Sequence, residues 1–129
     1  MAIANPYQQY QQQSVMTASP GELTLMLYNG CIKFIRQAQS GIEAGDIEKA
    51  NNSIIRCQDI LEELMVTLKP EYEISASLSA LYDYMYNRLI DANIAKDISI
   101  LDEVLGLVTE LRDTWAEVIR INRRQVYGG

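Results

Sequence analysis

The stretch from Ser19 to Gly45 constrains the fold of this chain more than any other part of the sequence. Ser19 is a preferred N-cap residue, Pro20 suits the first helical position, and Glu22 completes a capping box three residues after the serine. Gly45 is typical of a helix C-terminus. The pattern predicts one long helix, and with it a chain built from long helices.

The apolar residues of this predicted helix form two stripes. The first recurs at helical spacing and comprises Leu23, Leu27, Gly30, Cys31, Phe34, Ile35, Ala38 and Ile42. The second stripe, Leu25, Tyr28 and Ile32, steps by three and four residues and faces another direction. A surface helix usually has one apolar stripe. The helix is therefore either central in a bundle, with neighbours on both sides, or its second stripe binds a partner or the N-terminal segment of the chain itself.

Three further helices follow, each with a candidate N-cap. They are predicted over residues 46–68, 75–95 and 97–124, and begin at Asp46, Ser75 and Asp97. The connections are short, which forces consecutive helices to run antiparallel. The predicted fold is all-α: an antiparallel up-down four-helix bundle over residues 18–124, preceded by an N-terminal strap at 1–17 and followed by a frayed C-terminus at 125–129.

The composition narrows the functions that this chain can have. The net charge of −6 argues against nucleic acid and against an anionic membrane surface, because both require clustered positive charge. No run of about 18 apolar residues exists to insert into a membrane, and the N-terminus lacks the basic flank and apolar core of a signal peptide. We expect a cytoplasmic protein, with Cys31 and Cys57 as buried free thiols.

The residues needed for enzymatic chemistry are missing. The chain contains no histidine, which removes the commonest general base and metal ligand. Two cysteines cannot form a structural zinc site, and Gly21 and Gly30 stand alone instead of forming a phosphate-binding loop. We therefore predict no catalytic residue, no metal site and no cofactor, and we expect the protein not to be an enzyme.

The segments NPYQQY (residues 5–10) and SVMTASPGELTLMLYNG (residues 14–30) carry a family resemblance. They resemble the start of the flagellin-specific secretion chaperones, the FliS family. The family pattern is Asn-Pro-Tyr, a variable stretch, Ser or Thr-Ala-Ser-Pro, a leucine, and Met-Leu-Tyr-Asp/Asn-Gly. Asn29 stands where the family more often has aspartate. The dense match covers the first quarter of the chain, and beyond it only length and helix layout agree.

This resemblance implies a function and several partners. It implies a cytoplasmic export chaperone that binds the C-terminal segment of flagellin, prevents premature polymerisation and supports delivery to the flagellar export apparatus. It also suggests docking of an export-gate protein and of a second flagellin-binding regulator. In similar proteins the N-terminal segment covers part of the client groove, which assigns a lid or handover role to Tyr7, Tyr10 and Val15. The same segment also reads as a disordered glutamine-rich tail.

Helical-wheel geometry gives a candidate client-binding surface. It comprises Leu25, Tyr28, Ile32, Ile55, Tyr82, Tyr86 and Ile90. For Tyr82 and Tyr86 the alternative is packing in or beside the core.

Two other classes of function stay open. One is a generic helical adaptor whose extra stripe is a homodimer face. The other is a small cofactor-free enzyme that holds a dicarboxylate among arginines. Its candidate residues are Arg36, Arg56, Arg88 and Arg112, of which only Arg112 lies at a core edge.

Overall fold

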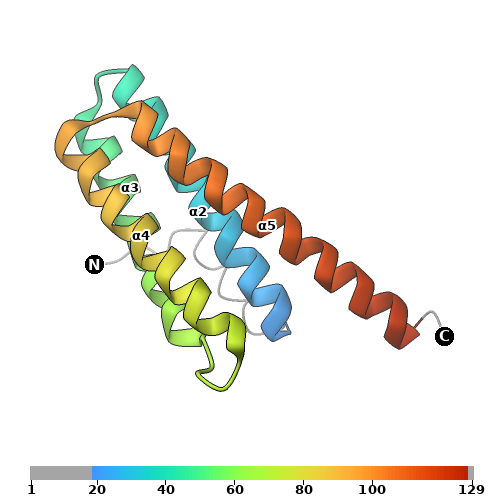
Figure 1. The fold of residues 1–129 in the computed structure, drawn as a ribbon. Coiled ribbons are helices and arrows are strands. Elements are labelled where there is room, and N and C mark those ends of the chain that lie inside the picture. Colours follow the sequence, from blue (N-terminus) through green and yellow to red (C-terminus); the bar gives the residue numbers. More distant parts are fainter. Residues whose placement is uncertain (1–18, 128–129) are drawn as a thin grey trace, which may run out of the picture.

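The computed structural model describes residues 19–127, and these form four helices with no strand among them. The helices are α2 (Pro20–Glu43), α3 (Ile47–Thr67), α4 (Glu73–Ala95) and α5 (Ile98–Tyr127). Each packs against the next along the chain, and α5 returns to pack against α2 (Figure 1). The predicted all-α up-down bundle is confirmed. The predicted strap, with Tyr7, Tyr10 and Val15, lies outside the described residues, and α5 continues to Tyr127, beyond the predicted bundle end at residue 124.

The boundaries of α2 follow from the local sequence. The Ser19 hydroxyl accepts a hydrogen bond from the backbone N–H of Glu22 at 3.2 Å. At the other end Gly45 has φ +72°, a conformation that glycine adopts without steric cost. Asp46 then caps α3, because its carboxylate accepts from the backbone N–H of Lys49 at 3.1 Å. The predicted caps of these two helices are confirmed.

The start of α4 differs from the prediction. Ser75 does not cap this helix, which begins two residues earlier at Glu73 with Tyr72 at the N-cap and no side-chain capping bond. The Ser75 hydroxyl instead donates to the carbonyl oxygen of Lys69 at 2.6 Å. The hydroxyl therefore holds the α3–α4 loop against the first turn of α4. A bond that reaches back across a loop is not encoded in helical spacing.

Helices α2 and α3 form the closest pair. A Cβ built on Gly41 would lie 2.9 Å from the backbone nitrogen of Ala50, so this position tolerates only glycine at the present spacing. Cys31 and Cys57 face each other across the same interface, with each Sγ about 4 Å from the other residue's carbonyl oxygen (4.0 and 3.9 Å). Both are buried free thiols, as predicted. The thiol–thiol contact and burial raise the pKa of Cys31 well above its usual value.

The buried core occupies one half of the bundle. Buried apolar side chains begin at Tyr28 on α2, end at Leu64 on α3, begin at Tyr82 on α4 and end at Val108 on α5. We call the remaining half the open half. It is defined by the partly buried Leu27, Leu68, Leu78, Leu81, Leu111 and Trp115 and the exposed Val118 and Ile121. Figure 1 shows α5 diverging from α4 in this half.

None of the four described helices combines the length and the apolar character needed to cross a bilayer.

Candidate functional site

Tyr28 and Tyr82, both predicted to bind a client, lie in the core. Their hydroxyl oxygens are 2.6 Å apart, and the side chains are only 3% and 1% exposed. Burial raises the pKa of both phenols. The structure therefore contradicts the prediction that these two residues lie on an exposed client-binding surface, and for Tyr82 it confirms the alternative, packing in the core. Each hydroxyl satisfies the other, which removes the penalty that would otherwise keep a tyrosine hydroxyl at the surface.

The second apolar stripe of α2 faces α5. Ile32 is 5% exposed, so its predicted place on an open surface is wrong as well, whereas Leu25 remains half-buried. Trp115 of α5 packs against the start of α2 and donates from Nε1 to the carbonyl oxygen of Gly21 at 2.7 Å. Of the two interpretations drawn from the sequence, a central helix with neighbours on both sides is the one that the structure supports.

The other predicted client residues lie on the opposite side of the bundle, along α3 and α4. Ile55 is 43% exposed, and Ile90, at 38%, lines a hollow of about 260 Å³ with Asn51 and Gln58 of α3. Tyr86 donates from its hydroxyl to Glu62 of α3 at 3.1 Å. The core separates these residues from Leu25. The seven predicted residues therefore do not form one continuous surface.

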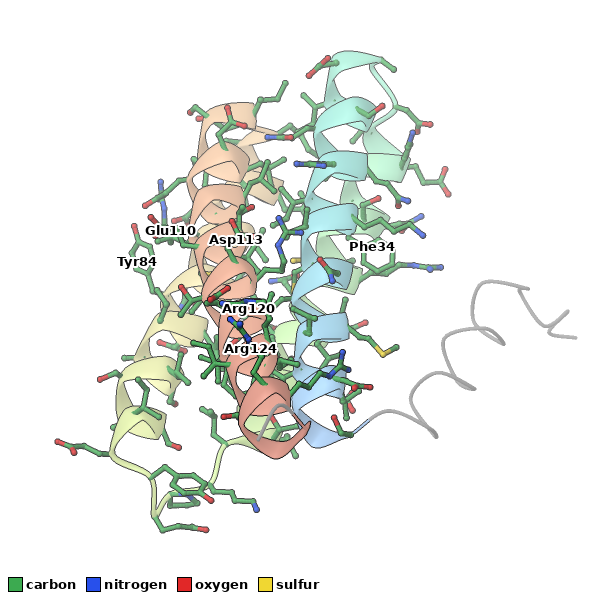
Figure 2. All side chains as sticks on the ribbon, turned by 90° about the vertical axis from the view of Figure 1, so that its right-hand side faces the viewer. Phe34, Tyr84, Glu110, Asp113, Arg120 and Arg124 are labelled. Atoms are coloured by element: carbon green, nitrogen blue, oxygen red, sulfur yellow. The ribbon has the colours of Figure 1, made fainter. Side chains whose placement is uncertain are left out.

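Sequence reasoning missed the exposed apolar residues at the end of α5. Tyr84 and Arg88 of α4 donate to Glu103 of α5 at 2.5 and 2.8 Å, which fixes the register of the two helices (Figure 2 labels Tyr84). Counting back from Tyr84 to the start of α4, and forward by the same number from Glu103, reaches Thr114. Val118 and Ile121 therefore extend past the start of α4. The unequal lengths of the predicted helices were a signal that could have found them.

The hydrogen bonds of Glu103 also shift the pKa values of the groups that form them. The hydrogen bond from Tyr84, followed by that from Arg88, holds the pKa of the Glu103 carboxyl below its usual value. The bond to Glu103 raises the pKa of Tyr84. Both side chains are exposed, so the cluster fixes helix register more than it contributes stability.

Cationic side chains gather on the side where α2 meets α5. Figure 2 looks onto this side, with Arg120 and Arg124 at the front of α5. A hollow of about 530 Å³ is lined by Glu22, Leu25, Ala116, Ile119, Arg120, Arg123 and Arg124. A second hollow of about 540 Å³ is lined by Asn29, Ile32, Lys33, Arg36, Gln37, Ser40, Lys49 and Arg112.

The four arginines considered for an anion-binding enzyme do not converge. Arg88 pairs with Asp91 and Glu103, and the guanidinium of Arg56 lies 5.7 Å from the centre of the Phe34 ring. Only Arg36 and Arg112 line the same hollow. Among residues 19–127, no group of three or more His, Cys, Asp or Glu side chains is placed to hold a metal ion.

Known proteins resemble this chain over nearly its whole length. The profile of the family described as "Flagellar protein FliS" matches residues 3–122. The "Flagellar secretion chaperone FliS" of Bacillus subtilis (strain 168) is 55% identical over 128 residues, which cover 99% of this chain and 96% of that protein. The protein of the same name from Salmonella typhimurium is 33% identical over 110 residues, covering 83% and 82%. A solved structure described as "Crystal structure of flagellar chaperone from bacteria" has the same fold, with a TM-score of 0.74, 22% identity and coverage of 88% and 94%.

Proposed function

The chain belongs to the FliS family of flagellar proteins, and from this membership we propose that it is a secretion chaperone for flagellin. In this proposal it binds the C-terminal segment of flagellin in the cytoplasm, prevents premature polymerisation and supports delivery to the export apparatus. The curated relatives carry the name of a secretion chaperone, and the family is one of chaperones, not of enzymes. The near full-length match is the observation that carries the proposal.

The exposed apolar side chains support client binding. Val118 and Ile121 on α5 and Ile90 on α4 are each more than a third exposed, and Ile94 is 81% exposed. Ile90 and Ile94 lie one helical turn apart on α4, and Val118 and Ile121 lie one turn apart on α5. Adjacent exposed apolar side chains of this kind are typical of a surface that a partner covers. An amphipathic client helix that lies along such a surface buries its own apolar face there, and is no longer free to pair with another copy of itself.

We assign client contact to the predicted residues that remain accessible. These are Leu25, Ile55, Tyr86 and Ile90, joined by Val118 and Ile121 of the open half. They lie on more than one side of the bundle, which suits a client that wraps around it instead of filling a single pocket. Such a client orders on binding and must bury a large surface to compensate for the entropy it loses.

The N-terminal segment is the proposed lid. Residues 1–17 join α2 at Ser19, and the start of α2 belongs to the open half. In this proposal Tyr7, Tyr10 and Val15 cover apolar side chains there until the client or the export-gate protein displaces them. A second flagellin-binding regulator is the other proposed partner.

Calorimetric titration with a peptide of the C-terminal segment of the cognate flagellin tests the function. The expected result is tight binding with a large negative heat-capacity change, because the client folds as it buries apolar surface. A variant lacking residues 1–17 should bind more tightly if the segment competes for the same side chains. Absence of any heat with the full chain, with circular dichroism showing it folded, would overturn the proposal. Sedimentation of the free chain then decides whether the exposed residues form a homodimer face.

A further inference from the structure

Two hollows follow each other along α2, and both have α5 residues in their lining. The first takes its α2 residues from Glu22 to Leu25 and the second from Asn29 to Ser40, so they follow each other along the same helix. We call the residues that line the two hollows the cationic seam. From Glu22 to Ser40 the seam is about 27 Å long at 1.5 Å per residue. This length equals about five turns of a helix laid beside it.

The seam concentrates the positive charge of an acidic protein. Three arginines line its first hollow, and two lysines and two arginines line its second. These are seven of the 11 lysines and arginines in a chain of net charge −6, whereas Glu22 is the only one of its 17 carboxylates to line either hollow. The partner that complements this seam is therefore negatively charged.

Several of the lysines and arginines in the seam can form ion pairs with a partner protein. Arg36, Lys49 and Arg124 make no ion pair with any described residue. Arg120 pairs with Glu117, and Arg123 with Glu22, but all four side chains are at least 40% exposed. Exposed ion pairs contribute little and exchange readily for a partner's carboxylate.

The floor of the seam is apolar. Leu25, Ala116 and Ile119 lie beneath the arginines of the first hollow, and Ile32 lies beneath the second. The cations of the first hollow all come from α5, and those of the second come from α2, α3 and α5. Apolar residues flanked by cations match a helix that has apolar residues on one face and carboxylates beside them. A nucleic acid offers no such apolar face, which favours an acidic helix over a nucleic acid as the partner.

We propose that the cationic seam docks an acidic amphipathic helix of a partner protein. The partner's apolar face would cover Leu25 and Ile119, and its carboxylates would pair with the arginines of α5 and with Arg36 and Lys49 at the far end. The seam lies on the opposite side of the bundle from Ile55 and Ile90. This inference goes beyond the proposed chaperone function, because Leu25 is the one proposed client residue that lines the seam. The remaining client residues stay accessible while a second protein occupies the seam.

A synthetic helical peptide of about 18 residues, with leucines on one face and glutamates on both flanks, is the probe. Trp115, the single tryptophan, contacts Gly21 one residue before Glu22 of the seam, and its fluorescence reports binding. Arg36→Glu and Arg124→Glu, at opposite ends, should each weaken binding by about tenfold, and added salt should weaken it further. Lys69→Glu makes the same charge change in the α3–α4 loop and should leave the affinity within about twofold of the parent.

Three outcomes would overturn this inference. Equal binding of a peptide in which glutamine replaces every glutamate would show that carboxylates are not recognised. An equal loss in Arg36→Glu and Lys69→Glu would show attraction by net charge alone. Binding of vesicles that contain anionic lipid, with no binding of the peptide, would assign the seam to a membrane. Addition of the flagellin peptide separates this inference from the proposed function, since strict competition would make the seam part of the client site and leave the chaperone function intact.

Discussion

The hydroxyl oxygens of Tyr28 and Tyr82 lie 2.6 Å apart in the core, and this hydrogen bond joins the diagonal helices α2 and α4. No buried side-chain nitrogen or oxygen among the described residues lacks a partner. Each of the two hydroxyls is therefore the hydrogen-bond partner of the other, and removing one leaves the other buried without a partner.

Tyr28→Phe and Tyr82→Phe should each lower the free energy of unfolding by about 1–3 kcal/mol, the cost of an unsatisfied buried hydroxyl. The double substitution should cost less than the sum of the two, because it leaves no orphaned group. Urea unfolding of the four proteins measures this coupling. Additive effects would mean that the two hydroxyls act independently.

The same pair predicts a loss of stability at alkaline pH. Burial raises the pKa of both phenols above the usual 10.0, so the folded state favours their neutral form. Their contribution to stability is complete below pH 10 and is lost as the pH rises above that value. Phenolate absorbance and helical circular dichroism, followed together, should change at the same pH for this pair. The variant with phenylalanine at both positions should retain its helicity to higher pH.

Gly41 and Gly106 should respond in opposite ways to alanine. At Gly41 the new methyl group would meet backbone atoms of α3, so Gly41→Ala should destabilise the fold by about 1–3 kcal/mol. At Gly106 nothing lies within 4 Å, and Gly106→Ala should stabilise α5 by about 0.5–1 kcal/mol. Thermal unfolding measures both, and similar melting temperatures would contradict the close approach of α2 and α3.

Ile90→Asp and Val118→Asp should weaken binding of the flagellin peptide by about tenfold or more, because each puts a charge where a client's apolar face is proposed to lie. Ile47→Asp is the matched control. Ile47 is 52% exposed in the first turn of α3, where a carboxylate suits the helix dipole. Calorimetric titration of the three variants measures their affinity for the flagellin peptide, and circular dichroism confirms that each variant is folded. Equal losses in all three would show that these positions are not a specific client site.

The sequence alone predicts those structural features that depend on residues close together in the chain. Ser19 and Asp46 cap their helices through bonds to residues three positions on, which is why a short pattern predicts them. Ser75 failed as a cap because its hydroxyl bonds back to Lys69 across a loop. The spacing of neighbouring residues does not show whether a serine hydroxyl will cap its own helix or bond back across a loop.

The candidate site was harder to predict, because exposure depends on which helices meet. A helical wheel drawn for α2 alone shows that Tyr28 and Ile32 lie off its main stripe. It does not show that neighbouring helices cover both residues in the folded bundle. Conversely, Val118 continues the core stripe of α5 in sequence and is still exposed, since α4 begins too late to cover it. Burial in a bundle is set by the lengths and positions of the partner helices as much as by the stripe itself.

The pairing of α2 with α5 has a consequence for the order of assembly during synthesis. These helices touch in space but stand at opposite ends of the chain, as the bond from Trp115 to Gly21 illustrates. Helices α2, α3 and α4 can dock in turn as they leave the ribosome, whereas the side of α2 that packs against α5 stays uncovered until α5 has been translated. Until then Ile32 stays exposed to solvent. The nascent chain therefore passes through an intermediate with exposed apolar surface that is prone to aggregation, and this surface is buried in the finished protein.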